Sequence, residues 1–258
     1  MKLSNFSAAL AVCLVAGSVQ ARSEEKTCVP EVYEAVMTDL KTVELSSGEG
    51  GNVVSESCKI WPYDERFILA ALAYDAGEEY EKQLVVAVID RKSWRVSSHY
   101  KKTVDEDAAT EFGAGSLRID TARYQLADGV RAFAVRFDSS SMGPSCGEAS
   151  WSDELTLFVP EGKQLRPVLN LAMNKQKSFS GCLSTESSNA VWENAKLTIG
   201  VGTTRTNGLS DLQVTAKITA DSNGPRLGKH KNRTEQQVFH YDGKVYRGEK
   251  NVPWWLEY

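Results

Sequence analysis

The sequence predicts an all-β protein, a single domain of packed antiparallel sheets preceded by one short N-terminal helix. Three observations point to this class. Along most of the chain after residue 58, apolar and polar residues alternate with the period of two expected of a half-buried strand. Dipeptides that end in glycine separate these runs, as they do in β-hairpins. Helical periodicity is confined to one stretch near the N-terminus.

The composition is that of an ordinary globular protein. The chain has 258 residues, of which 41% are hydrophobic and 25% are charged, and these values exclude collagenous, coiled-coil and disordered classes. The formal net charge of −4 provides no general attraction for nucleic acid or anionic lipid. We therefore expect no nucleic-acid partner.

The first residues have the pattern of an export signal. Lys2 supplies a positive charge, an apolar run follows, and Ala21 is the small residue that a signal peptidase requires. We therefore predict a signal peptide over residues 1–21 and a mature domain over residues 22–258, located in the periplasm or secreted. The apolar run is too short to cross a bilayer as a helix, and no later run is long enough, so we predict no membrane span. A lipoprotein processed at Cys13 is the alternative.

Four cysteines remain after this cleavage, and an even number in an exported chain favours two disulfides. They are Cys28, Cys58, Cys146 and Cys182. Of the three possible connectivities we favour Cys28 with Cys58 and Cys146 with Cys182, because shorter loops close at a lower cost in entropy. We expect these bonds to be structural, since the spacing lacks the paired CxxC clusters of a zinc site.

The expected elements follow in chain order. One helix is predicted over Pro30–Leu40, where Val32, Val36 and Leu40 share a face and a proline stands in the first turn. Residues 84–89 are apolar at every position, which indicates a central strand covered on both faces. Strands with one buried face are indicated by alternation at residues 133–137, 155–159, 197–201 and 212–218.

Turn dipeptides separate these strands. Asp128-Gly129, Glu161-Gly162 and Asn207-Gly208 each lie between two apolar runs. Asp242-Gly243 is predicted to form a two-residue type I′ turn, because both residue types tolerate positive φ.

The hairpins divide the chain into three units, near residues 60–105, 115–175 and 195–250, each with three or four strands. Three units are too few for the usual closed propeller. We therefore expect a sandwich-like packing of several sheets, with an incomplete propeller of three sheet units as the alternative.

No set of catalytic residues stands out in the sequence. A GxSxG motif does not occur, and His99, His230 and His240 lie in separate predicted strands and loops. The acidic run at residues 104–111 lacks the spacing of a calcium loop, and no glycine-rich loop precedes a helix. We therefore predict no catalytic residue, no metal site and no cofactor, and we favour a protein that is not an enzyme.

Two features are candidates for binding. The first is a basic loop in an otherwise acidic chain, made of Arg226, Lys229, Lys231 and Arg233. Such a loop suits an acidic partner or a lipopolysaccharide phosphate, although a solvated loop is the simpler alternative. The second is the pair Trp254 and Trp255 in the C-terminal tail, which either presents an apolar anchor to a partner or caps the end of the core.

The run from Leu117 to Leu126, LRIDTARYQL, continues through Gly129 to Arg136 as GVRAFAVR. Taken with the tail and the signal, this run resembles a stretch found in exported proteins of uncharacterised proteobacterial families. The resemblance implies a periplasmic setting and no particular mechanism.

Two functions from different classes follow. The first is an exported, non-catalytic binding protein of inhibitor, immunity or accessory type, which recognises another macromolecule, either a protein or an envelope polymer. The alternative is a secreted hydrolase of cell-wall or sugar polymers, whose carboxylate pair would come from Asp120, Asp153, Glu154 and Asp211. Geometry separates the two, because a glycosidase needs two carboxylates that face each other across the scissile bond. The sequence indicates no oligomeric state.

Overall fold

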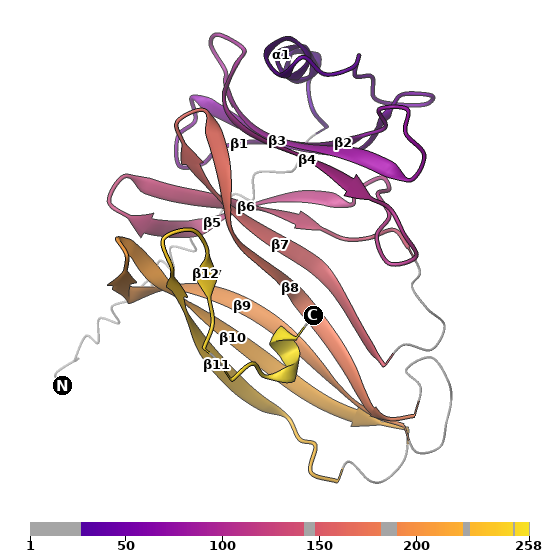
Figure 1. Cartoon of the computed structure of the whole chain (residues 1–258), viewed down its shortest axis with the longest axis vertical. Helices are drawn as coiled ribbons and strands as arrows, with labels where there is room; N and C mark the ends of the chain where they lie inside the picture. Colours follow the sequence, from indigo (N-terminus) through magenta and orange to yellow (C-terminus); the bar gives the residue numbers. More distant parts are fainter. Residues whose placement is uncertain (1–26, 142–147, 182–189, 224–227, 250, 258) are drawn as a thin grey trace, which may run out of the picture.

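The computed structural model describes residues 27–141, 148–181, 190–223, 228–249 and 251–257. In this part of the chain the structure is mainly β, with one α-helix and one short 3₁₀ helix. The elements stack in layers, from α1 at one end of the molecule to the last strands at the other (Figure 1). The predicted all-β domain is therefore confirmed.

The first layer is a four-stranded antiparallel sheet covered by the helix. Its strands are, in spatial order, β1 (Val53–Ile60), β2 (Phe67–Tyr74), β3 (Glu81–Asp90) and β4 (Arg95–Asp105). Helix α1 (Pro30–Leu40) has the bounds predicted from the sequence, and it buries Val32 and Val36 against this sheet. The Cys28–Cys58 disulfide joins the segment before α1 to β1.

The second and third layers are joined by one long strand. The second layer contains β5 (Leu117–Ala127), β6 (Val130–Phe137), β7 (Ala149–Glu161) and β8 (Gln164–Ser180). The third contains β9 (Val191–Thr206), β10 (Leu209–Ser222), β11 (Arg233–Tyr241) and β12 (Tyr246–Arg247). Strand β8 pairs with β7 along most of its length and with β9 near its C-terminal end, so the hydrogen-bonded ladder continues from one layer to the next. The 3₁₀ helix η1 (Trp254–Leu256) contacts β8.

Three clusters of apolar side chains hold the layers together. One lies between α1 and β1–β4, one between β1–β4 and the second layer, and one between the second and third layers. Strand β3 separates the first two clusters: Val85 and Ala87 face α1, whereas Val86 and Val88 face the second layer. This confirms the prediction that residues 84–89 are covered on both faces.

The layers correspond to the three units predicted from the hairpins, and they stack as in a sandwich, without closing into a propeller. One departure from the predicted antiparallel order occurs where β4 meets β8. These strands pair in parallel at His99 and Gln164, so the sheet is mixed. β4 and β8 are edge strands of the first and second layers, and the hydrogen-bonded ladder passes from one layer to the other at this pair.

The turns follow the predictions with one correction. Asn207 and Gly208 form a two-residue turn in which both φ values are positive, 49° and 88°. The two-residue turn predicted at Asp242-Gly243 is wrong, since the strands close one step further out, at the pair of Tyr241 and Tyr246. The Asp242 carboxylate accepts hydrogen bonds from two backbone N–H groups of this wider loop and satisfies them.

Candidate functional site

The basic loop does not present all of its predicted cations to solvent. Arg226 lies outside the described residues, and Lys229 and Lys231 are exposed. Arg233 turns inward, and its guanidinium donates to the Glu193 carboxylate through Nη1–Oε1 (2.7 Å) and Nη2–Oε2 (2.9 Å). Of the predicted cations that the structure describes, the two lysines therefore remain available to a partner.

The two tryptophans of the tail have different surroundings. Trp255 is 0% exposed, and its indole N–H donates to Glu235, which also accepts a hydrogen bond from Arg233. Trp254 is partly buried, and its ring lies edge-on to that of Phe179, with 6.2 Å between the centroids. Trp255 thus belongs to the core, while a binding role for Trp254 stays a prediction.

One of the two predicted disulfides is present. Cys28 and Cys58 are bonded, as favoured from the sequence. Cys146 and Cys182 lie outside the described residues, so their pairing stays a prediction.

Two of the carboxylates considered for a hydrolase do come together, but around an arginine. Asp120 Oδ2 lies 2.9 Å from Arg136 Nη2, and Asp153 Oδ2 lies 2.5 Å from Nη1 of the same side chain. Asp153 also binds Arg118 at 2.8 Å. The guanidinium occupies the place that a glycosidic oxygen or a water would need between a catalytic pair. The cluster therefore suits the joining of β5, β6 and β7 better than it suits acid–base catalysis.

The other two carboxylates have partners outside this cluster. Glu154, on β7, accepts a hydrogen bond from the Trp151 indole at 3.2 Å. Asp211, on β10, accepts one from the Thr204 hydroxyl at 2.6 Å and lies 3.0 Å from Nδ1 of His240. Glu154 directly follows Asp153 on β7, whereas Asp211 lies on β10 and binds residues of the third layer.

Two acidic side chains of the run at residues 104–111 bind other groups of the chain. The Asp107 carboxylate accepts hydrogen bonds from the N–H groups of Ala109 and Thr110, and Glu106 binds Lys82 at 3.0 Å. In the described ranges no group of three or more histidine, cysteine or acidic side chains is placed to hold a metal ion. Over the same ranges, every helix is too short or too polar to cross a membrane.

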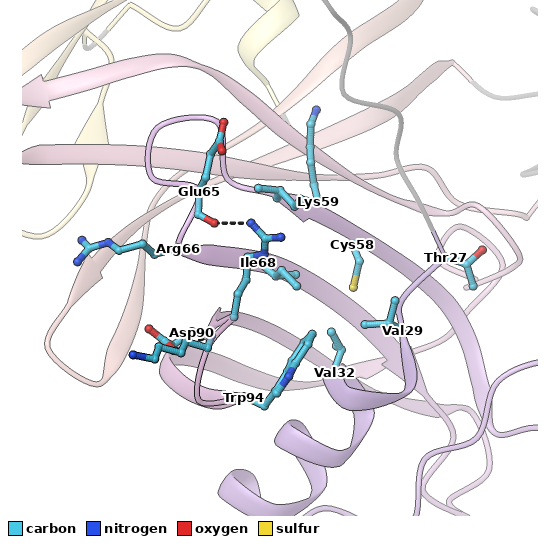
Figure 2. A pocket seen from close by; sticks show the side chains of 13 residues that line it. Thr27, Val29, Val32, Cys58, Lys59, Glu65, Arg66, Ile68, Asp90 and Trp94 are labelled. Carbon is cyan, nitrogen blue, oxygen red and sulfur yellow. Dashed lines mark hydrogen bonds between the residues drawn. The ribbon is translucent and has the colours of Figure 1, made fainter.

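A cavity of about 890 Å³ opens beside α1, where β1 ends, β2 begins and β3 turns into β4 (Figure 2). This volume is within the range of small-molecule binding sites. Most of its wall is apolar and is formed by Val29, Val32, Cys58, Ile60, Ile68 and Trp94. We take this cavity as the candidate functional site.

The apolar wall runs from the buried core to the surface. Val32, on the inner face of α1, is 0% exposed, and Figure 2 shows it beside Trp94. Val29 and Ile60 lie nearer the mouth and are 44% and 42% exposed. Large apolar side chains left uncovered around a concave surface are typical of a ligand site.

The rim of the cavity is charged and carries more cations than anions. Its charged residues are Lys59, Glu65, Arg66, Asp90, Arg91 and Lys92. The Asp90 carboxylate accepts hydrogen bonds from the backbone N–H and the hydroxyl of Ser93 in its own turn, and these bonds lower its pKa. Arg91 donates to the backbone carbonyl of Glu65 at 2.8 Å. Lys59 lies on the face of β1 turned away from α1, and Figure 2 shows its side chain pointing away from the cavity. Lys92 forms no ion pair with any described residue, so it is left to bind an anionic group at the rim.

Trp94 has an unusual backbone conformation for a bulky residue. Its φ is 51°, in the left-handed region that glycine and asparagine occupy at lower cost. The turn holds it there through a hydrogen bond from its N–H to the carbonyl of Asp90 at 2.9 Å. Strained residues of this kind cluster at functional sites. The indole lines the cavity and also packs against the apolar cluster beneath α1.

This cavity was not among the sites predicted from the sequence. Its wall comes from four separate segments, which lie at residues 27–32, 58–60, 65–68 and 90–94. Hydrophobic periodicity identifies the apolar face of each segment, but it does not indicate which part of that face another element will cover. The available signal was Trp94 itself, an aromatic residue beside Arg91 and Lys92 in a turn that would favour asparagine or glycine.

Comparison of the chain with protein-family models, with curated proteins and with solved structures finds no match. The resemblance to exported proteobacterial proteins therefore stays a prediction. What the cavity binds has to be inferred from its own geometry and chemistry.

Proposed function

We propose that this chain is an exported binding protein without catalytic activity, and that the cavity beside α1 holds the acyl chain of an anionic amphiphile. The observation that carries the proposal is the combination of an apolar wall and a cationic rim in one cavity of about 890 Å³. The acyl chain would lie against Val29, Val32 and Trp94. Its carboxylate or phosphate would lie at the rim, near Lys92.

Burial of the acyl chain would supply most of the affinity. Each methylene removed from water contributes about 0.8 kcal/mol, so a chain of about ten buried methylenes offsets the cost of immobilising the ligand. Exposed lysines contribute about 1 kcal/mol or less each, because water and salt screen them. We therefore expect affinity to depend steeply on chain length and weakly on the head group.

Two further observations support the proposal. The Cys28–Cys58 disulfide supports export, since such bonds persist in oxidising compartments. The position of Arg136 between Asp120 and Asp153 supports a role other than glycoside hydrolysis.

Isothermal titration with three ligands below their micellar concentrations tests the proposal. Laurate is expected to bind with a stoichiometry of one. Octanoate, which lacks four methylenes, is expected to bind at least about tenfold more weakly. Undecyl maltoside has the alkyl chain of laurate and a neutral head group, and its affinity is expected to be up to about fivefold lower than that of laurate.

Two matched variants place the ligand in the cavity. Val29→Asp puts a charge at the mouth, whereas Val43→Asp puts the same charge on a valine of nearly equal exposure, 43%, that does not line the cavity. Val29→Asp is expected to lower laurate affinity at least about tenfold, and Val43→Asp to leave it unchanged. A wild-type protein that does not bind laurate, or a Val29→Asp variant that binds it normally, would refute the proposal.

A substitution of Trp94 gives a second test of where laurate binds. Trp94→Asn removes the indole but retains a residue type that tolerates positive φ, so the turn is expected to keep its shape. Laurate affinity is expected to fall while circular dichroism stays that of the wild type.

A further inference from the structure

A polar groove of about 480 Å³ crosses strands β7, β8, β9 and β10. These strands lie next to one another in the sheet, β7 and β8 in the second layer and β9 and β10 in the third (Figure 1). The groove is on the face opposite the apolar cluster between the second and third layers, because Leu197, Ala216 and Ile218 point from β9 and β10 into that cluster. It is separate from the cavity beside α1.

Strand register aligns the polar side chains of the groove in two rows. One row pairs, from strand to strand, Ser152, Asn174, Lys196 and Lys217. The other pairs Ser150, Gln176, Asn194 and Thr219. Side chains directly opposite each other in a sheet point to the same face, so hydroxyl, amide and ammonium groups line up across four strands. With a strand spacing of about 4.8 Å, the rows span roughly 14 Å.

The two exposed lysines of the groove lie directly opposite each other. Lys196 on β9 pairs in register with Lys217 on β10, an arrangement of like charges that destabilises a sheet. Neither forms an ion pair with any residue that the structure describes, and no carboxylate lines the groove. Lys175 also lines it, but its ammonium donates to the backbone carbonyl of Glu257. An anion placed between Lys196 and Lys217 would relieve their repulsion.

Trp151 forms one end of the groove and is 46% exposed. Its indole N–H donates to Glu154 Oε1 at 3.2 Å, so the ring is oriented by a hydrogen bond from its edge and part of its face remains open to a ligand. Rigid aromatic faces of this kind pack against flat apolar surfaces, and the C–H face of a sugar ring is one such surface. Amides such as Asn174 and Gln176 both donate and accept hydrogen bonds, as sugar hydroxyls require.

We propose that this groove binds an acidic polysaccharide, a glycan whose sugar units carry carboxylates. Trp151 stacks against one ring, the amides bind hydroxyl groups, and Lys196 and Lys217 share a carboxylate. The overall charge of −4 opposes adsorption of a polyanion, so binding requires this local arrangement. The inference does not depend on the proposed acyl site, because the two sites share no residues.

The test measures equilibrium binding of the mature chain to three fluorescently labelled polymers by anisotropy. Polygalacturonate has sugar rings and carboxylates, dextran has sugar rings without charge, and poly-L-glutamate has carboxylates without sugar rings. We expect polygalacturonate to bind at least about tenfold more tightly than either of the other two. Equal binding to poly-L-glutamate, or absence of binding to polygalacturonate, would overturn the proposal.

Variants with matched charge locate the site. Lys196→Gln with Lys217→Gln is expected to lower affinity for polygalacturonate at least about tenfold and to reduce its dependence on salt. Lys163→Gln with Lys244→Gln makes the same change in net charge at exposed lysines outside the groove and is expected to have little effect. Similar losses in both double variants would contradict the assignment.

The aromatic contact has its own control. Trp151→Ala is expected to lower affinity about tenfold, and Trp151→Phe, which keeps a ring without the indole N–H, to retain most of it. Equal affinity of the alanine variant and the wild type would exclude stacking at Trp151. Thermal unfolding of each variant distinguishes loss of the groove from loss of the fold.

Discussion

Arg233 and Glu193 form a two-point ion pair inside the third layer, with distances of 2.7 and 2.9 Å and only 3% of the Glu193 side chain exposed. His230 approaches the same carboxylate at 2.9 Å. Arg233 also binds Glu235, whose second oxygen accepts the indole N–H of Trp255. One network therefore joins the basic loop, β9, β11 and the C-terminal tail.

Removing Arg233 is expected to destabilise the fold. Arg233→Met leaves the buried Glu193 carboxylate without its main partner, and loss of one member of a buried pair costs about 3–5 kcal/mol. Arg233→Met combined with Glu193→Leu is expected to recover much of this loss, because no uncompensated charge remains. Urea unfolding measures both, and a single variant as stable as the wild type would contradict the role of the pair.

The same network predicts a loss of stability in acid. Burial raises the pKa of Glu193, but hydrogen bonds from Arg233 and His230 outweigh that effect, so the pKa lies below its ordinary value of 4.5. A carboxyl whose pKa is lowered by folding stabilises the protein above its unfolded pKa, and this contribution is lost as the pH falls through the folded pKa. We expect the unfolding free energy of the wild type to fall below pH 4.5 more steeply than that of Glu193→Gln. Parallel pH profiles of the two proteins would exclude this assignment.

Trp255 is expected to be one of the most sensitive core positions. Trp255→Ala removes a completely buried indole and should cost about 3–5 kcal/mol through lost burial and the cavity left behind. Trp255→Phe keeps most of the apolar volume but leaves Glu235 without the indole donor, at a cost of about 1–3 kcal/mol. Thermal unfolding checks that stability decreases from the wild type to Trp255→Phe to Trp255→Ala. Variants whose main unfolding transition is the same as that of the wild type would contradict this prediction.

The Cys28–Cys58 disulfide links stability to the cavity beside α1. The bond spans a sequence separation of 30, and its removal in Cys28→Ala with Cys58→Ala is expected to cost about 3–4 kcal/mol. Cys58 lines the cavity, and so does Val29, the residue after Cys28. We therefore also expect weaker laurate binding under conditions where the variant is still folded. If the double substitution leaves laurate affinity unchanged, the disulfide is not required for the shape of the cavity.

Asp153 allows a clean test of the cluster around Arg136. Its φ is 58°, which asparagine tolerates, so Asp153→Asn removes the charge without adding backbone strain. We expect a loss of about 1–3 kcal/mol, because two arginines lose a partner that is only 15% exposed. A variant more stable than the wild type would show that repulsion between the Asp153 and Asp120 carboxylates outweighs the attraction of Asp153 to the two arginines.

Much of the fold was predictable because it depends on local pattern. The bounds of α1 follow from apolar residues spaced four apart after a proline, and the double coverage of β3 follows from a run without polar positions. The last hairpin was predicted wrongly, since the Asp242 side chain stabilises a wider loop than the dipeptide alone suggests.

The sites were less predictable because their residues meet only through the stacking of layers. Arg233 belonged to a basic loop in the sequence, yet its partner Glu193 lies 40 residues away and turns it into an internal group. Asp120 and Asp153 could be named as a pair, but not the arginine that separates them.

By itself, the sequence determined where apolar faces occur along the chain, where the helix lies and that Cys28 pairs with Cys58, since these depend on the period of the backbone and on a short loop. The tertiary structure alone decided which apolar side chains remain uncovered beside α1 and which polar rows meet across β7–β10. The physical reason is that the polarity of a face is set by residues close together in the chain, whereas the covering of that face depends on contacts between strands that are far apart in the chain.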